Sequence, residues 1–144
     1  GLAGENPVWG RFWDHPALTG AQRQILLRAR DRARAEVTAA TNLDYGLIHA
    51  DMVRENVLVD DGKIGLIDFD DGGFGYRLFD IATALIKNRA EPDYGDLTTA
   101  LLRGYRSVRP LDTALLPVFM MLRSFTYLGW IMLRRDEPGG AELH

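Results

Sequence analysis

The sequence predicts a mainly α-helical fold that carries one small antiparallel β-hairpin. Apolar residues recur at helical spacing in four segments, residues 19–40, 76–88, 93–108 and 112–135. Two short apolar runs, residues 57–59 and 64–67, flank Asp60-Asp61-Gly62-Lys63, and an Asp-Gly pair between β-branched residues is typical of a tight hairpin turn. Because 47% of the 144 residues are hydrophobic, we expect residues 1–144 to form a single domain with its own core.

The first helix has the clearest start. Thr19-Gly20-Ala21-Gln22 is a capping box, in which the threonine and glutamine side chains bond backbone N–H groups at a helix start. We expect the helix to run to about Ala40. The segment before it, residues 2–18, has no period, and we expect its three largest aromatic residues to pack as core, namely Trp9, Phe12 and Trp13.

The last helix raises a membrane question. Residues 114–133 carry one charge, Arg123, and this length could cross a bilayer. Since a charge at the centre of the membrane costs about 2.5–3.5 kcal/mol, we expect a buried core helix in which Pro117 lies in the first turn. Arg123 should then snorkel or pair with an acid, or else extend into a substrate cleft.

The hairpin brings two oxygen ligands together. If its turn has three residues, Asn56 lies opposite Asp68. Opposed residues in such a ladder have Cα atoms about 4.5–5.5 Å apart, close enough for both side chains to bind one Mg²⁺ ion, whose oxygen ligands lie at about 2.0–2.1 Å. A two-residue turn would shift the register by one and leave the two residues adjacent.

A loop upstream of the hairpin adds a second carboxylate. Residues 45–48 form an apolar run that ends at His49, and the five-residue step from Asp51 to Asn56 suits a loop that returns to the same end of the hairpin. Asp51 therefore faces the metal-binding pair without having to be a ligand. A carboxylate there can accept the proton of a substrate hydroxyl beside a metal-bound polyphosphate.

These motifs resemble those of the aminoglycoside phosphotransferase, choline kinase and homoserine kinase group of small-molecule kinases. The group's signature is HxDxxxxN, then an I-D-[FW]-[DE] run, then Asp-Leu-Ala opening a helix. This chain is similar to it at His49-Ala50-Asp51-Met52-Val53-Arg54-Glu55-Asn56, at Ile67-Asp68-Phe69-Asp70-Asp71 and at Asp80-Ile81-Ala82. The resemblance implies the C-terminal lobe of a protein-kinase-like α+β fold.

The resemblance also implies roles for individual residues. Asp51 would be the catalytic base, Asn56 and Asp68 would hold Mg²⁺ with ATP or GTP, and Asp80 would support the backbone of the catalytic loop. We expect His49 to shape the same loop by hydrogen bonding, because Asp51 already fills the role of proton acceptor.

The chain departs from the family pattern at two positions. Ala50 stands where glycine is usual, a small-for-small change that we expect to be harmless. Val53 stands where the family often has histidine, so a phosphate-contacting group is either displaced to Arg54 or absent. Residues 69–75 also resemble those of hydroxylysine kinase-like members.

Acidic residues around the motifs indicate the charge of the substrate. Between His49 and Asp80 the chain has eight acidic and three basic residues. Metal ions would neutralise part of this surplus, and Glu55, Asp70 and Asp71 remain candidate contacts for an amine-bearing hydroxyl compound such as an amino alcohol, a hydroxy amino acid or an aminoglycoside. Alternatively, Asp70 and Asp71 stabilise the glycine-rich loop that follows them.

The chain lacks the parts that clamp the phosphates of a nucleotide in a protein-kinase-like enzyme, which are a glycine-rich strand-turn, a lysine and a glutamate paired with that lysine. The glycine-rich residues 72–75 follow the metal ligand, and Lys63 and Lys87 lie in the hairpin turn and in a helix. We therefore expect the catalytic lobe alone, with the N-terminal nucleotide-clamping lobe encoded upstream or missing. Such a lobe should be a poor kinase by itself, and its uncovered face is a candidate oligomer interface.

Composition narrows the other possibilities. The chain has no cysteine, which excludes disulfides and thiolate metal sites and fits a cytoplasmic location, and we expect no targeting segment at Gly1. A net charge of −3 and a pI near 5.6 argue against nucleic-acid and anionic-membrane partners. Two alternatives stay open: a pseudokinase or regulatory module that binds a partner, and a metal-dependent hydrolase, although hydrolase sites usually include histidine ligands.

Overall fold

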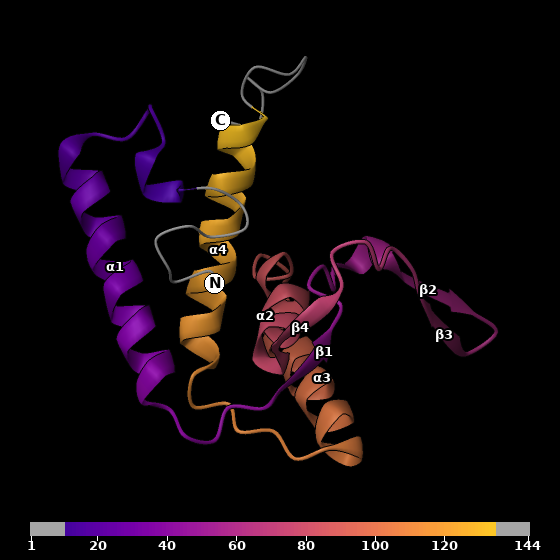
Figure 1. Cartoon of the computed structure of the whole chain (residues 1–144). Helices are drawn as coiled ribbons and strands as arrows, with labels where there is room; N and C mark the ends of the chain where they lie inside the picture. The colour runs from indigo at the N-terminus through magenta and orange to yellow at the C-terminus, as the bar shows by residue number, and fades with distance from the viewer. Residues whose placement is uncertain (1–10, 135–144) are drawn as a thin grey trace. The chain divides into compact units, whose positions relative to one another are not determined.

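The computed structural model describes residues 11–134, and Figure 1 shows the order of the elements. In chain order these are η1 (Phe12–Asp14), α1 (Gly20–Ala39), β1 (Tyr45–Ile48), η2 (Arg54–Asn56), β2 (Val57–Asp60), β3 (Lys63–Leu66), β4 (Gly73–Tyr76), α2 (Arg77–Ile86), α3 (Tyr94–Val108) and α4 (Leu116–Leu133). The described chain divides into two compact units, residues 11–41 with 121–134 and residues 42–120. The single-domain organisation expected for residues 1–144 stays a prediction.

The first unit is built on α1 and a group of aromatic rings. The predicted capping box is present, since Thr19 Oγ1 accepts the N–H of Gln22 at 3.3 Å and Gln22 Oε1 accepts the N–H of Thr19 at 2.8 Å. Phe12 and Trp13 are buried, and the ring of Phe12 stacks on that of Phe125 with centroids 4.3 Å apart. The expected aromatic core is confirmed for these residues, whereas Trp9 lies outside the described part of the chain.

The second unit contains both strand pairs together with α2 and α3. β1 pairs antiparallel with β4, β2 pairs antiparallel with β3, and α2 packs against β1 and β4. The buried apolar face of α2 comprises Leu78, Phe79, Ile81, Ala82 and Leu85. α3 has no buried residue, so its apolar stripe is only partly covered.

The β2–β3 hairpin forms where it was predicted, but with a two-residue turn. Asp60 pairs with Lys63 and Val57 pairs with Leu66, which corrects the three-residue register. Asp61 has φ +45° and Gly62 has φ +74°. Positive φ at both central residues defines the type I′ turn, whose twist matches that of the strands. Asp61 tolerates this backbone region better than most residues because its short side chain can bond locally, and the tight turn therefore takes only two residues.

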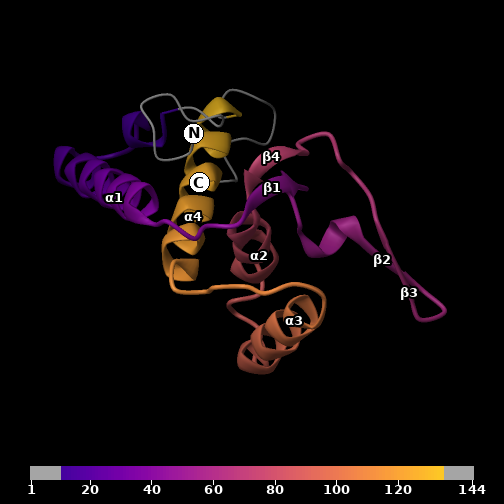
Figure 2. The same cartoon turned by 60° about the horizontal axis from the view of Figure 1, so that its bottom comes forward.

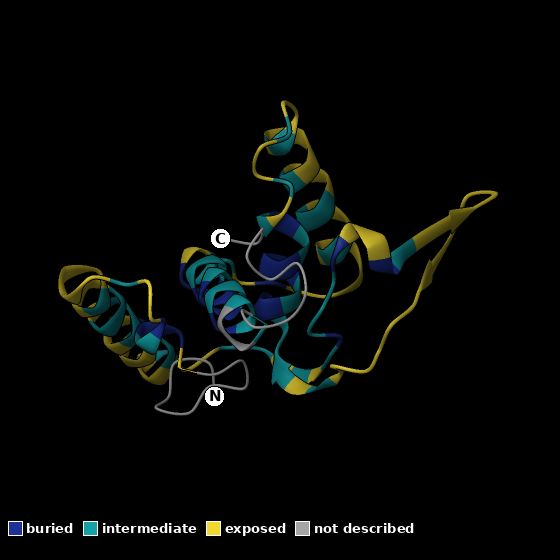
Figure 3. Ribbon diagram, turned by 90° about the horizontal axis from the view of Figure 1, so that it is seen from above, coloured by how far each residue is buried: buried dark blue, intermediate teal, exposed yellow. Residues whose placement is uncertain are grey.

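The β2–β3 hairpin is apolar and exposed. Val59 and Ile64 are 71% and 72% exposed, and Leu58 is 51% exposed. Figures 1 and 2 show the two strands extending away from α2 and α3, and the hairpin is coloured as exposed in Figure 3. An isolated two-stranded hairpin is marginally stable in water, so this surface is suited to being covered.

α4 begins at Leu116, four residues later than predicted, which places Pro117 in the first turn, where proline is tolerated. Arg123 is only 7% exposed, so snorkelling to solvent, the first of the expected alternatives, is wrong, while pairing with an acid stays a prediction. Its Nη1 donates to Thr126 Oγ1 at 2.8 Å, and its guanidinium lies 4.6 Å from the centre of the Tyr127 ring. Among the described residues, no helix combines the length and the apolar character that crossing a membrane requires.

Candidate active site

The β1–β4 ribbon brings the two predicted motifs together. Ile48 at the end of β1 pairs with Gly73 at the start of β4. The loop after β1 holds His49 and Asp51, and the loop before β4 holds Asp68 and residues 69–72. Because an antiparallel pair places the end of one strand beside the start of the other, these two loops lie at the same end of the ribbon. This pairing is not evident in the sequence, because the paired residues are 25 to 31 positions apart.

Asp80 lies beneath the first of these loops. Its Oδ2 accepts the N–H of His49 and its Oδ1 accepts the N–H of Ala50, each at 2.8 Å. Asp80 is in the first turn of α2, so the helix that packs on the ribbon also holds the backbone of the loop. Hydrogen bonds to an ionised carboxylate are roughly twice as strong as neutral ones.

His49 joins the two loops from within. The side chain is 5% exposed, its Nε2 lies 2.8 Å from the carbonyl oxygen of Ile67, and its Nδ1 accepts the N–H of Asp51 at 3.4 Å. This pattern requires the tautomer with hydrogen on Nε2, because Nδ1 is the acceptor. The ring also packs against Phe69, with centroids 4.6 Å apart. His49 thus connects the Asp51 loop to the residue before Asp68.

Asn56 contacts Asp51 directly. The Asn56 side chain is 7% exposed, and its Nδ2 donates to the backbone carbonyl of Asp51 at 2.9 Å and to Asp51 Oδ2 at 3.3 Å. The amide nitrogen is therefore committed to Asp51, and Oδ1 is the oxygen that Asn56 can offer to another group. On the hairpin side, the carbonyl oxygen of Asn56 accepts the N–H of Ile67 at 3.1 Å.

Two site residues adopt left-handed backbone conformations. Ala50 has φ +67° and Asp68 has φ +64°. In a regular strand the one-residue register shift would place Asn56 and Asp68 on opposite faces, but the backbone of Asp68 leaves strand geometry and that alternation stops there. A residue other than glycine costs about 1–2 kcal/mol in this region, so alanine in place of glycine at position 50 is not energetically neutral.

Arg54 and Glu55 contact protein groups. Arg54 Nη2 donates to Asn88 Oδ1 and lies 3.1 Å from Glu91 Oε1. Glu55 Oε1 lies 3.7 Å from Lys87 Nζ. A hydrogen bond from backbone N–H, followed by the charge of Lys87, lowers the pKa of Glu55 from its ordinary value of 4.5. The other two predicted contacts, Asp70 and Asp71, are exposed in the turn after Asp68.

An ion-pair cluster around Asp44 was not predicted from the sequence. Asp44, just before β1, accepts hydrogen bonds from Arg77 at the start of α2 and from Arg109 after α3, the latter at 2.7 Å. A Cβ at Gly46 would lie 2.1 Å from Arg77 Nη2, so this glycine leaves room for the guanidinium. The paired residues are 33 and 65 positions apart, and no spacing rule could have found them.

The donor chemistry of Asn56 and Asp68 suits a Mg²⁺ ion that is shared with a nucleotide. Within residues 11–134, no three His, Cys, Asp or Glu side chains form a group that could hold a metal by themselves. Mg²⁺ is commonly bound by one or two carboxylates together with substrate phosphates and water, so such a site requires fewer protein ligands than a metal held by side chains alone. The Oδ1 atom of Asn56 and the exposed carboxylate of Asp68 are ligands of that kind.

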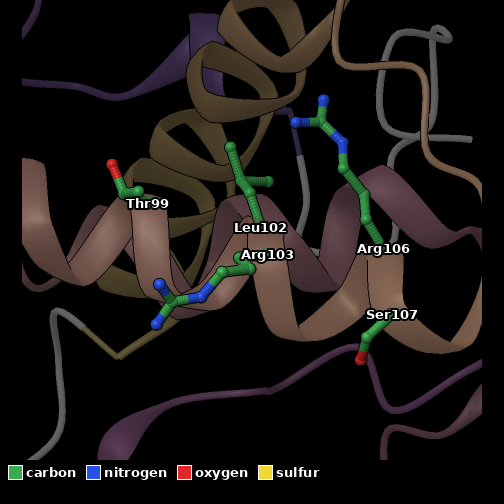
Figure 4. A pocket seen from close by; sticks show the side chains of 5 residues that line it. All are labelled: Thr99, Leu102, Arg103, Arg106 and Ser107. Carbon is green, nitrogen blue, oxygen red and sulfur yellow. The ribbon is translucent and has the colours of Figure 1, made fainter.

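A separate pocket of about 550 Å³ lies on α3 and is lined by Thr99, Leu102, Arg103, Arg106 and Ser107. Figure 4 shows Arg103 and Arg106 extending from the helix in different directions, so their guanidinium groups do not converge. Arg106 already donates to the carbonyl of Leu111 at 3.4 Å and to Thr113 Oγ1 at 3.2 Å. None of the predicted site residues lines this pocket.

Comparison with known proteins agrees with the motifs. Residues 5–111 match the phosphotransferase enzyme family. The chain belongs to this family. A homoserine kinase from Acidiphilium cryptum is 42% identical over 123 residues, covering 79% of this chain and 37% of that enzyme. A homoserine kinase from Polaromonas naphthalenivorans is 32% identical over 150 residues, covering 88% of this chain and 47% of that enzyme.

Two solved structures share the fold of this chain. A microcompartment-associated aminopropanol kinase has 35% identity and a TM-score of 0.76, covering 94% of this chain and 45% of that one. An amicoumacin kinase in complex with AMP-PNP and Ca²⁺ has 25% identity and a TM-score of 0.70, covering 88% and 42%. The predicted fold class, mainly α with one small antiparallel hairpin in the C-terminal lobe of a protein-kinase-like α+β fold, is confirmed, and the β1–β4 pair adds a second antiparallel ribbon. The chain spans less than half the length of these relatives.

Proposed function

We propose that the full-length protein is a small-molecule kinase that transfers the γ-phosphate of ATP or GTP to the hydroxyl of a small, amine-bearing compound. The observation that carries this proposal is the contact of Asn56 with Asp51, in a loop whose backbone is hydrogen-bonded to Asp80. This contact joins a carboxylate and a side-chain amide in a chain that belongs to the phosphotransferase family.

Each residue has a role in the proposed reaction. Asp51 accepts the proton of the substrate hydroxyl, the hydroxyl oxygen bonds to the γ-phosphorus, and the bond from that phosphorus to the β–γ bridging oxygen breaks, releasing ADP or GDP. Asn56 Oδ1 and the Asp68 carboxylate would hold Mg²⁺, which when bound neutralises charge on the phosphates. His49 and Asp80 keep the Asp51 loop in place.

The named activities of the relatives support an amine-bearing acceptor. Homoserine and aminopropanol each carry an amine and a hydroxyl, and these compounds name the kinases that the chain resembles. The exposed acids Asp70 and Asp71, in the turn after Asp68, are suited to contact a cationic amine.

We further propose that the remaining part of the protein supplies the nucleotide-clamping lobe and covers the exposed hairpin. The proposal is supported by the exposed apolar side chains of Val59, Ile64 and Leu58 and by the fraction of each relative that the chain spans. The described chain alone should therefore be a poor kinase. If that lobe is absent in the native protein, the same surface is the one on which an oligomer would form.

The test is turnover by the full-length protein with Mg²⁺·ATP or Mg²⁺·GTP and a panel of amino alcohols, hydroxy amino acids and aminoglycosides. Asp51→Ala should lower kcat by about 10²–10⁴-fold, the usual contribution of a catalytic base, while leaving AMP-PNP affinity largely unchanged. Asp68→Ala should weaken Mg²⁺·AMP-PNP binding itself. Asp93→Ala, which removes an exposed carboxylate at the start of α3, is the matched control.

The same assay separates the alternatives. Nucleotide binding without turnover of any acceptor would favour a pseudokinase, and phosphate release without an acceptor would favour a hydrolase. Full activity in Asp51→Ala would show that Asp51 is not the catalytic base.

A further inference from the structure

Helix α2 and the turn that follows it hold the candidate catalytic loop at two points. At the first turn of α2, Asp80 accepts the N–H groups of His49 and Ala50. Beyond the end of α2, Glu91 and Asn88 bind the side chain of Arg54. The loop from His49 to Arg54 is therefore attached at one end to α2 and at the other end to the turn that follows α2.

The two residues that bind Arg54, Asn88 and Glu91, are themselves held by hydrogen bonds. The Asn88 Nδ2 donates to the carbonyl of Ala84 at 2.7 Å, which directs its Oδ1 toward Arg54. The N–H of Glu91 donates to the carbonyl of Asn88 at 3.0 Å, so the two acceptors of Arg54 belong to one turn. A guanidinium with several donors in a fixed plane suits two acceptors at once.

Arg54 is linked to the candidate site through the short helix that it begins. Arg54 begins the short helix η2, which ends at Asn56, and the carbonyl of Arg54 accepts the N–H of Val57. Asn56 in turn donates its Nδ2 to the carbonyl and carboxylate of Asp51. Releasing Arg54 would therefore loosen the turn that carries Asn56, and with it the Asn56–Asp51 contact.

We propose that Arg54 is a positioning residue that fixes Asn56 and Asp51 through Glu91 and Asn88, and that it does not contact the transferred phosphate. This inference rests on the proposed kinase function, because it assigns a role within that site. It replaces the expectation that Arg54 substitutes for the phosphate-contacting group missing at Val53.

Kinetics of four variants of the full-length protein distinguish anchoring from phosphate contact. Arg54→Ala should lower kcat by a factor on the order of tenfold, because small misplacements of catalytic groups are costly. Glu91→Ala should lower kcat by a smaller factor, because Asn88 still accepts from Arg54, and the double variant should be no worse than Arg54→Ala. The KM for Mg²⁺·ATP should stay within about twofold. The fourth variant, Arg89→Ala, removes an exposed arginine from the same turn and should behave as wild type.

Charge exchange provides a rescue experiment. Arg54→Glu alone should be defective, and Arg54→Glu combined with Glu91→Arg should recover most of the kcat. An arginine that binds phosphate could not be replaced in this way. A raised KM for Mg²⁺·ATP in Arg54→Ala, with wild-type behaviour of Glu91→Ala and no rescue by exchange, would overturn the proposal.

Hydrogen–deuterium exchange tests the anchoring without turnover. Amide exchange in residues 53–57 should accelerate about two- to fivefold in Arg54→Ala, Glu91→Ala and the double variant, which is the range expected for loss of an exposed ion pair, and should not change in Arg89→Ala. Unchanged exchange in Arg54→Ala would refute the anchor even if the protein is a kinase. If wild type phosphorylates no acceptor while exchange responds as expected, the kinase function fails and the anchoring stands.

Discussion

Asp80 holds Ala50 in a left-handed backbone conformation. Asp80 Oδ1 accepts the N–H of Ala50 at 2.8 Å, and Ala50 has φ +67°. The second oxygen of the same carboxylate accepts the N–H of His49 at 2.8 Å. Strained backbone of this kind persists where surrounding contacts over-determine it, and here a single side chain fixes the two amides that lead into Asp51.

Replacing Asp80 with asparagine should destabilise the protein. Asp80→Asn exchanges one acceptor oxygen for an NH₂ group that would face a backbone N–H, so we expect the free energy of unfolding to fall by about 2 kcal/mol, as for a lost hydrogen bond to a charged group. Urea denaturation of the full-length protein measures this. Asp93→Asn, at an exposed position whose side chain does not cap α3, should change stability little. Equal effects of the two substitutions would contradict the role of Asp80.

Restoring glycine at position 50 should stabilise the fold slightly. Ala50→Gly relieves a left-handed conformation that costs about 1–2 kcal/mol but adds unfolded-state entropy worth about 0.4–1 kcal/mol, so we expect a net gain of about 0.5 kcal/mol. Ala100→Gly, in the middle of α3, should instead lose about 1 kcal/mol. The thermal midpoints of the two variants should therefore shift in opposite directions, and a shift in the same direction would count against the strain at Ala50.

The turn after Asp68 depends on Gly72. A Cβ at this position would lie 2.8 Å from the carbonyl oxygen of Phe69, the oxygen that accepts the N–H of Gly72. We expect Gly72→Ala to cost about 1–3 kcal/mol, as for other overpacking changes, and to weaken binding of Mg²⁺·AMP-PNP by displacing Asp68. Gly73→Ala is the matched control, since a Cβ there has nothing within 4 Å. Calorimetry of both variants measures their stability and their binding of Mg²⁺·AMP-PNP. Equal effects of the two substitutions would contradict the role of Gly72.

Tyr105 should make stability fall in alkali. Burial, and then the negative charge of Asp44, raises the pKa of Tyr105 above its ordinary value of 10.0. Near and above that pH the unfolded chain loses this proton while the folded protein keeps it, so the contribution of Tyr105 is complete below pH 10 and is lost as pH rises through the raised pKa. Tyr105→Phe should flatten the decline of the urea midpoint above about pH 10. An identical decline in wild type and variant would show that Tyr105 does not cause it.

Features that depend on neighbouring residues could be predicted from the sequence alone. The capping box of Thr19 and Gln22, the Asp61-Gly62 turn and the apolar face of α2 depend on interactions within a few positions, which the order of residues specifies directly. The motif residues were predicted from their spacing, and their roles from the resemblance to the kinase family. His49, Asp51 and Asn56 are close in sequence, and the structure joins them by hydrogen bonds.

Tertiary structure decided which distant residues meet. The β1–β4 pairing, the Asp44–Arg77–Arg109 cluster and the attachment of Arg54 to Glu91 join positions that are 25 to 65 residues apart, and no local propensity encodes such partners. The hairpin was predicted only in part. The residues of its turn were evident from the sequence, but the length of the turn depends on the positive φ of Asp61, which only the structure shows. The sequence thus determined the helices, the turn and the set of candidate residues by itself. The meeting of the Asp51 loop and the Asp68 loop at one end of the β1–β4 ribbon came only from long-range strand pairing, which depends on where distant parts of the chain have folded.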